Sequence, residues 1–175
     1  ERIIRQWQAM TGIDRLVGNL MKELEQLNLQ KNTIIIFSSD HGLFMGEQGL
    51  GGKALCYEKN TKVPLIIFDP RAKKNRQGIE NDALVQSIDI APTMLAIAGI
   101  SVPEEFQGKD LAPLLSADKS GLRSYVFTEN LWSTQFGNPR CEAVQDKEWK
   151  YIRYYQNNNF PASKKIKTAE LLGMN

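Results

Sequence analysis

Two short apolar runs place the strongest constraint on how this chain can fold. Residues 33–37 read TIIIF and residues 63–68 read VPLIIF, so both runs are apolar at nearly every position. A strand with one face in water alternates apolar and polar residues, whereas a strand covered on both faces is apolar throughout. The two runs are therefore predicted to be buried parallel strands of a sheet that is flanked by helices.

Helical periodicity precedes the first run and follows the second. Apolar residues at steps of three and four predict an amphipathic helix over residues 3–27 that covers the sheet. This stripe consists of Ile3, Trp7, Met10, Ile13, Val17, Leu20, Leu24 and Leu27. A second helix is predicted over residues 92–98, with Asp89 as its N-cap and Gly99 at its C-terminal end. Helices and strands alternate, so the predicted fold class is α/β.

The composition changes after about residue 116. Residues 125–128 form a further candidate strand, and residues 141–145 and 149–155 read as two strands joined by the polar turn 146–148. A hairpin of this kind predicts an antiparallel sheet. We therefore expect an α/β part over residues 1–116, followed over residues 117–175 by the start of a small antiparallel C-terminal subdomain with a loop-like end.

Charge, cysteines and hydropathy indicate no particular partner. The formal net charge is +2 over 175 residues, which points neither to nucleic acid nor to a membrane surface. Cys56 and Cys141 lie far apart and lack metal-binding spacing, so two free thiols are expected. No apolar stretch approaches the ~18 residues of a membrane span. The chain begins with Glu1 inside the predicted first helix, without an initiator methionine, so we expect it to be a fragment.

Chemically competent residues follow the first apolar run. Asp40, His41 and Gly42 come directly after this run, and a glycine-rich loop then leads to Lys53. Ligands of open α/β sheets bind at the carboxyl ends of strands. A carboxylate oxygen and an imidazole nitrogen can both ligate a metal ion, and a lysine adds a positive point charge. The structural alternative is that Asp40 caps the next segment, His41 is a hydrogen-bonded histidine and Lys53 is a solvated loop lysine.

A series of short motifs resembles the sulfatase family of the alkaline-phosphatase-like superfamily. The resemblance covers nearly the whole chain, because the order and spacing of the motifs agree from the first helix to the C-terminal strands. The motifs are TGID at 11–14, SSDHG at 38–42, GEQGL at 46–50, GK at 52–53, VPLI at 63–66, SIDIAPT at 87–93, QGK at 107–109 and WKY at 149–151.

The resemblance implies roles for three residues. Asp40 matches a family aspartate that ligates a divalent cation, usually calcium, and His41 matches the next position, which is asparagine or histidine in different members. Lys53 matches the lysine that contacts the sulfate ester. Glu47 is expected to orient the loop. Gln48 stands where many members carry histidine, which leaves any proton-transfer role of that position in question.

The other half of such a site is missing from the sequence. The family implies a formylglycine nucleophile, made from Cys or Ser in a C/S-x-P-x-R motif, and further acidic metal ligands. The nearest match, SVPEE at 101–105, has Glu105 in place of the arginine. The expected function is therefore the C-terminal portion of a sulfuric ester hydrolase that is inactive in isolation. The alternatives are a phosphonate or phosphodiester hydrolase of the same superfamily, or a non-catalytic binding fragment.

The resemblance also implies the partners and the cellular location. The substrate would be a sulfated small molecule or carbohydrate, and the missing N-terminal part of the same protein would complete the site. No nucleic-acid or membrane partner is expected, and the family favours an extracytoplasmic location. Because calcium prefers six to eight oxygen ligands, Asp40 and His41 alone are expected to bind it weakly or not at all.

Overall fold

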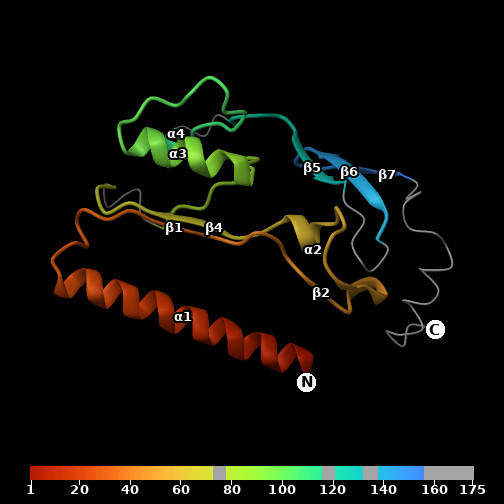
Figure 1. Cartoon of the computed structure of the whole chain (residues 1–175), viewed down its shortest axis with the longest axis horizontal. Coiled ribbons are helices and arrows are strands. Elements are labelled where there is room, and N and C mark those ends of the chain that lie inside the picture. The colour runs from red at the N-terminus through yellow and green to blue at the C-terminus, as the bar shows by residue number, and fades with distance from the viewer. Residues whose placement is uncertain (73–77, 116–120, 132–137, 156–175) are drawn as a thin grey trace.

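The computed structural model describes residues 1–72, 78–115, 121–131 and 138–155 (Figure 1). Within these residues the chain forms short helices, one long helix and three small antiparallel sheets. The elements are α1 Arg2–Gln26, β1 Ile35–Ser38, β2 Phe44–Met45, the 3-10 turn η1 Glu47–Gly49, β3 Gly51–Gly52, α2 Glu58–Thr61, β4 Leu65–Phe68, the 3-10 turn η3 Ser87–Asp89, α3 Ile90–Ile97, α4 Ala112–Leu115, β5 Val126–Asn130, β6 Arg140–Gln145 and β7 Lys150–Tyr155.

The two apolar runs become β1 and β4, and they pair with each other. The pairing is antiparallel, with Ile35 opposite Phe68 and Ser38 opposite Leu65, so the prediction of parallel strands is wrong for this pair. The β4 side chains alternate between half-buried and exposed positions. An apolar run therefore identified the strands correctly, but it carries no information about strand direction.

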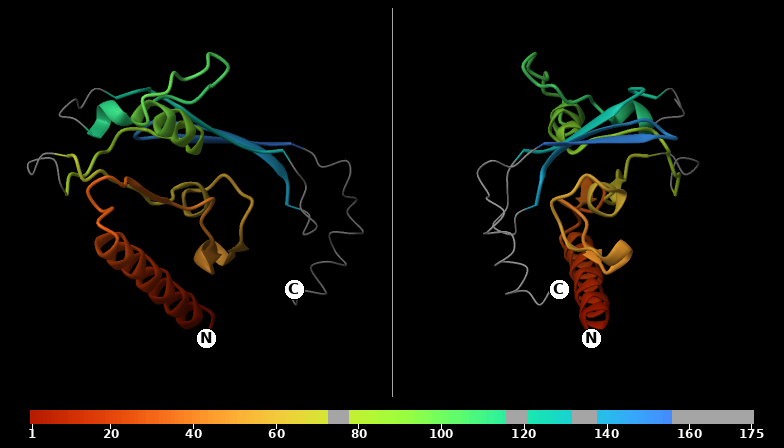
Figure 2. Two further views of the ribbon diagram at one scale, coloured as in Figure 1. Left: turned by 60° about the vertical axis from the view of Figure 1, so that its left-hand side comes forward. Right: turned by 90° about the vertical axis from the view of Figure 1, so that its right-hand side faces the viewer.

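The long helix α1 is confirmed, although the described residues do not bury its apolar stripe. Figures 1 and 2 show the β1–β4 pair between α1 on one side and α3 on the other. Trp7 is 70% exposed and Leu20 is 47% exposed, whereas Val17 and Leu24 are half-buried. The expected helical layer is present, and most of its apolar face remains open. No helix in the described part of the chain combines the length and apolarity needed to cross a bilayer.

The predicted C-terminal antiparallel sheet is present, with the order β5-β6-β7. The carboxylate of Asp146 closes the β6–β7 turn by accepting hydrogen bonds from the amides of Glu148 (2.8 Å) and Trp149 (2.6 Å). Cys141 and Ala143 of β6 are buried in a small cluster together with Cys56. The predicted boundary after residue 116 and the predicted loop-like end after residue 155 both lie outside the described residues.

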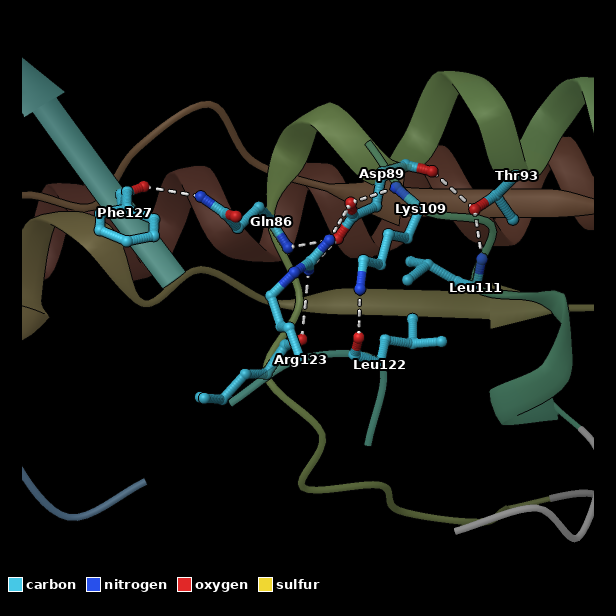
Figure 3. Close-up of polar contacts among 9 residues, drawn as sticks. Gln86, Asp89, Thr93, Lys109, Leu111, Leu122, Arg123 and Phe127 are labelled. Atoms are coloured by element: carbon cyan, nitrogen blue, oxygen red, sulfur yellow. Dashed lines mark hydrogen bonds and ion pairs between the residues drawn. The ribbon is translucent and has the colours of Figure 1, made fainter. Parts of the chain in front are cut away.

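Asp89 is the N-cap residue of helix α3, as predicted, but its side chain makes no capping hydrogen bond to that helix and binds other groups instead (Figure 3). Its carboxylate accepts hydrogen bonds from the amides of Gln86 (2.7 Å) and Lys109 (2.8 Å), and both oxygens bind the guanidinium of Arg123 at 2.5 and 2.6 Å. Burial alone would raise the pKa of Asp89, yet these hydrogen bonds outweigh burial and lower the pKa below its ordinary value.

Hydrogen bonds of Asp89 and Thr93 also hold the segment that follows α3 in place. Thr93 donates its hydroxyl to the Asp89 carbonyl at 2.6 Å and accepts the amide of Leu111 at 2.8 Å. At Gly108 a Cβ atom would lie 1.9 Å from the carbonyl oxygen of Ile88, so only glycine permits this close backbone approach. Residues 108–111 and Arg123 are thereby fixed against the start of α3.

Candidate functional site

The Asp40-His41-Gly42 turn follows the end of β1 and packs against the segment around α2. The amide of Gly42 donates to the Asn60 carbonyl at 2.9 Å. A Cβ atom on Gly42 would lie 1.9 Å from the carbonyl oxygen of Lys59. The glycine that permits this contact therefore determines where the two preceding side chains lie.

The structure brings Asp40, His41 and Lys53 together. The ring Nδ1 of His41 lies 3.0 Å from the Gly42 carbonyl oxygen, which can only accept a hydrogen bond, so Nδ1 carries the proton. In the neutral ring, Nε2 then presents its lone pair and accepts from the ammonium of Lys53 at 2.6 Å. A carboxylate oxygen of Asp40 lies 3.2 Å from the same Nε2.

Only one of the two carboxylate oxygens of Asp40 accepts a backbone hydrogen bond, which leaves the other oxygen able to bind a ligand. Oδ1 accepts the amide of His41 at 2.9 Å, whereas Oδ2 faces the ring nitrogen. The Asp40 side chain is 82% exposed and that of His41 is 31% exposed, so a ligand can approach from the solvent side. An oxygen and a nitrogen 3.2 Å apart are spaced as two neighbouring ligands of one cation could be.

The loop that carries Lys53 is a tight two-stranded ribbon. Phe44 of β2 pairs with Gly52 of β3, and the turn between the strands contains η1. The carboxylate of Glu47 accepts the amide of Met45 at 2.6 Å, and this hydrogen bond lowers the pKa of Glu47. The predicted orienting role of Glu47 agrees with this contact.

The chain just after Lys53 rests on the C-terminal sheet, which sequence reasoning missed. The side-chain amide of Asn138 donates to the Lys53 carbonyl at 3.1 Å, and that of Asn130 donates to the Ala54 carbonyl at 2.6 Å. These partners are 85 and 76 positions apart along the chain. No local pattern marks such distant pairs, so the sequence held no signal for them.

Two further contacts join the segment around α2 to the C-terminal sheet. Lys150 of β7 binds the carboxylate of Glu58 at 2.6 Å and the hydroxyl of Thr61 at 2.8 Å. The two cysteines are free, as expected, but their sulfur atoms lie 3.4 Å apart in the buried cluster. Burial, followed by the hydrogen bond with Cys141, raises the pKa of Cys56 to about 12.

The residues present fit only part of a calcium site. Among the described residues, no group of three or more His, Cys, Asp or Glu side chains could hold a metal ion. Asp40 and His41 could offer at most two ligands, against the six to eight oxygen ligands that calcium prefers. The Nε2 lone pair of His41 can accept from Lys53 or ligate a cation, but it cannot do both at once.

Comparison with known proteins identifies the family. Residues 46–163 match the family described as N-sulphoglucosamine sulphohydrolase, C-terminal, and residues 7–60 match Type I phosphodiesterase / nucleotide pyrophosphatase. The chain is 33% identical over 155 residues to an N-acetylglucosamine-6-O-sulfatase of Bacteroides thetaiotaomicron. This match covers 85% of the chain and 27% of that protein.

Solved structures show the same fold. BT4656 in complex with its substrate D-glucosamine-2-N,6-O-disulfate matches with a TM-score of 0.78 and 27% identity, over 94% of this chain and 38% of that one. The phosphonate monoester hydrolase SpPMH from Silicibacter pomeroyi matches with a TM-score of 0.70 and 27% identity, over 81% of this chain and 30% of that one. The chain thus spans well under half the length of these proteins, and it belongs to the sulfatase family of the alkaline-phosphatase-like superfamily.

Proposed function

We propose that this chain is the C-terminal portion of a sulfuric ester hydrolase and carries part of its active site. The observation that supports this proposal is the convergence of Lys53, His41 and Asp40, with Lys53 Nζ 2.6 Å from His41 Nε2. In this proposal Lys53 contacts the sulfate group, while Asp40 and His41 contribute two ligands to a divalent cation site, with calcium as the ion. Residues 1–116 belong to the α/β domain and residues 117–175 begin the C-terminal subdomain.

The chemistry assigned to this half-site is charge neutralisation. A sulfate ester is hydrolysed to an alcohol and sulfate, and negative charge on the oxygens increases as the ester bond breaks. A bound divalent cation would polarise these oxygens, and the Lys53 ammonium would stabilise the same charge. The nucleophile, a formylglycine, and the remaining metal ligands would come from a part of the protein outside this chain.

The relatives support a proposal for the substrate class. The matched N-acetylglucosamine-6-O-sulfatase and the disulfated glucosamine bound to BT4656 favour a sulfated carbohydrate for the parent enzyme. An extracytoplasmic location is the matching proposal for a protein that acts on such sugars. The isolated 175 residues are proposed to be inactive, because no residue of this chain is assigned as the nucleophile.

The role of Lys53 can be tested in the full-length parent protein with an aryl sulfate as substrate. Replacing Lys53 with Ala should lower kcat/KM by about a hundredfold or more, since the removed group stabilises charge in the transition state. The matched control is Lys31→Ala, which removes an exposed lysine next to β1. Wild-type activity in the Lys53→Ala protein would exclude this assignment, and so would an equal loss in the control.

A second candidate is a phosphonate or phosphodiester hydrolase. It is favoured by the match of residues 7–60 to Type I phosphodiesterases and by the similarity to SpPMH. Parallel assays of the parent protein with an aryl sulfate and an aryl phosphonate monoester separate the two activities. Turnover of the phosphonate alone would favour the second candidate, and turnover of neither would favour a non-catalytic binding fragment.

A further inference from the structure

Two asparagine side chains of the C-terminal sheet region hold the main chain at Lys53. Asn130 is the last residue of β5, and Asn138 lies two residues before β6. Their amide nitrogens donate to consecutive carbonyls, that of Lys53 at 3.1 Å from Asn138 and that of Ala54 at 2.6 Å from Asn130. The peptide units next to Lys53 are thus hydrogen-bonded to the C-terminal sheet region, whereas Asp40 and His41 follow a strand of a different sheet.

The backbone on both sides of Lys53 is in a conformation that needs such support. Gly52 has φ +82° and Ala54 has φ +77°. Glycine adopts positive φ freely, but alanine does so only where the surrounding structure compensates the steric cost. The short hydrogen bond from Asn130 to the Ala54 carbonyl provides this compensation at the residue directly after Lys53.

Other contacts confine the same segment to the same sheet. The thiol of Cys56 is hydrogen-bonded to that of Cys141 of β6, at 3.4 Å between sulfur atoms, and Lys150 of β7 binds Glu58 at 2.6 Å. At its other end, the side chain of Lys53 reaches His41 Nε2 at 2.6 Å. Lys53 therefore spans two parts of the fold, with its main chain on the C-terminal sheet and its ammonium on the turn after β1.

We propose that Asn130 and Asn138 are positioning residues of the active site, which place the Lys53 ammonium for the anionic ester through the main chain. This inference rests on the proposed role of Lys53. It makes the C-terminal sheet a functional part of the site, although neither asparagine touches the cluster of Asp40 and His41. The simpler alternative is that the asparagines only add stability, in the way that any half-buried amide contact does.

The experiment uses the full-length protein and two readouts, the affinity for inorganic sulfate by calorimetry and the kinetics on an aryl sulfate. The variants are Asn130→Ala, Asn138→Ala and Lys53→Ala, each assayed well below its own unfolding midpoint. A displacement of about 1 Å at a reacting group costs up to about a hundredfold in rate. We therefore expect a loss of about tenfold or more in sulfate affinity and in kcat/KM for both asparagine variants. The matched control is Lys147→Ala, which removes a contact between the β6–β7 turn and Asp82 (2.8 Å), at the opposite end of β6 from Asn138.

The outcomes separate this inference from the proposed function. Wild-type sulfate affinity in folded Asn130→Ala and Asn138→Ala proteins, together with a loss in Lys53→Ala, would overturn the positioning role alone. Full affinity and activity in Lys53→Ala would overturn the role of Lys53 and this inference with it. If Asn130→Ala fails to fold, Asn130→Leu keeps about the size of the side chain and removes the amide donor without adding a charge. Wild-type affinity in that variant, or an equal loss in the Lys147→Ala control, would also refute the proposal.

Discussion

The buried ion pair between Asp89 and Arg123 gives the strongest prediction for stability. The Asp89 side chain is fully buried and that of Arg123 is 10% exposed, and two hydrogen bonds of 2.5 and 2.6 Å join them. Replacing Arg123 with Met leaves a buried carboxylate without its counter-charge. Removing one partner of a buried pair costs about 3–5 kcal/mol. For a chain of this size each kcal/mol lowers the midpoint by about 2–4 °C, so we expect a loss of roughly 6–20 °C.

Thermal and urea unfolding followed by circular dichroism measure this loss. The matched control is Arg71→Met, because Arg71 also makes a hydrogen-bonded pair, with Asp69 at 2.9 Å, but is 58% exposed. Water screens an exposed pair and can replace its hydrogen bonds, so the control should change the midpoint little. Equal midpoints for the Arg123→Met and Arg71→Met proteins would refute the assignment of Asp89 and Arg123 as a stabilising pair.

The same pair predicts a pH dependence. The pKa of Asp89 is lowered in the folded protein, so its contribution is present above the ordinary carboxyl pKa of about 3.9 and is lost as the pH falls through the lower, folded value. The wild-type protein should therefore lose more stability below about pH 4 than the Arg123→Met protein does. Parallel acid losses in the two proteins would show that the lowered pKa does not depend on Arg123.

Three further predictions concern the thiols, the glycines and the cation. Burial raises the pKa of Cys56 to about 12, so a thiol reagent should react far more slowly with the folded protein than with the unfolded protein at pH 8. Equal rates would contradict the burial of this thiol. Gly42→Ala should destabilise the protein, because the added Cβ would meet the Lys59 carbonyl. Gly12→Ala, in the open part of α1, should stabilise it by about 0.5–1 kcal/mol. A higher thermal unfolding midpoint for Gly42→Ala than for Gly12→Ala would refute this. Calorimetry should detect calcium binding to the full-length protein and little binding to the isolated 175 residues, and tight binding to the isolated chain would contradict the half-site.

The elements that the sequence predicts well are those with a local cause. The periodicity of α1, the apolar runs of β1 and β4 and the polar turn between β6 and β7 each lie within one continuous segment of the chain. The convergence of Lys53 on Asp40 and His41 was also predictable, because a glycine-rich loop of fixed length joins them. The sequence analysis thus recovered the local elements, while the roles of Asp40, His41 and Lys53 stay predictions.

The features that escaped prediction depend on distant partners. The antiparallel direction of β1 and β4 depends on how the chain returns between them, which the composition of a strand does not reveal. The pairs Asp89–Arg123 and Asn130–Ala54 join positions 34 and 76 residues apart, and an isolated Arg or Asn shows no periodicity. Such contacts follow from the assembled fold and could only be read from the structure.

The docking of Cys56 beside Cys141 bears on how the chain can be divided. The boundary expected from composition separates residues 1–116 from residues 117–175, yet the buried sulfur atoms come from opposite sides of it. Arg123 likewise crosses this boundary to reach Asp89. Separate expression of the two parts would leave the Asp89 carboxylate without its counter-charge in one part, and it would expose one of the two buried cysteines in each. We therefore expect the two parts to lose their structure in one transition.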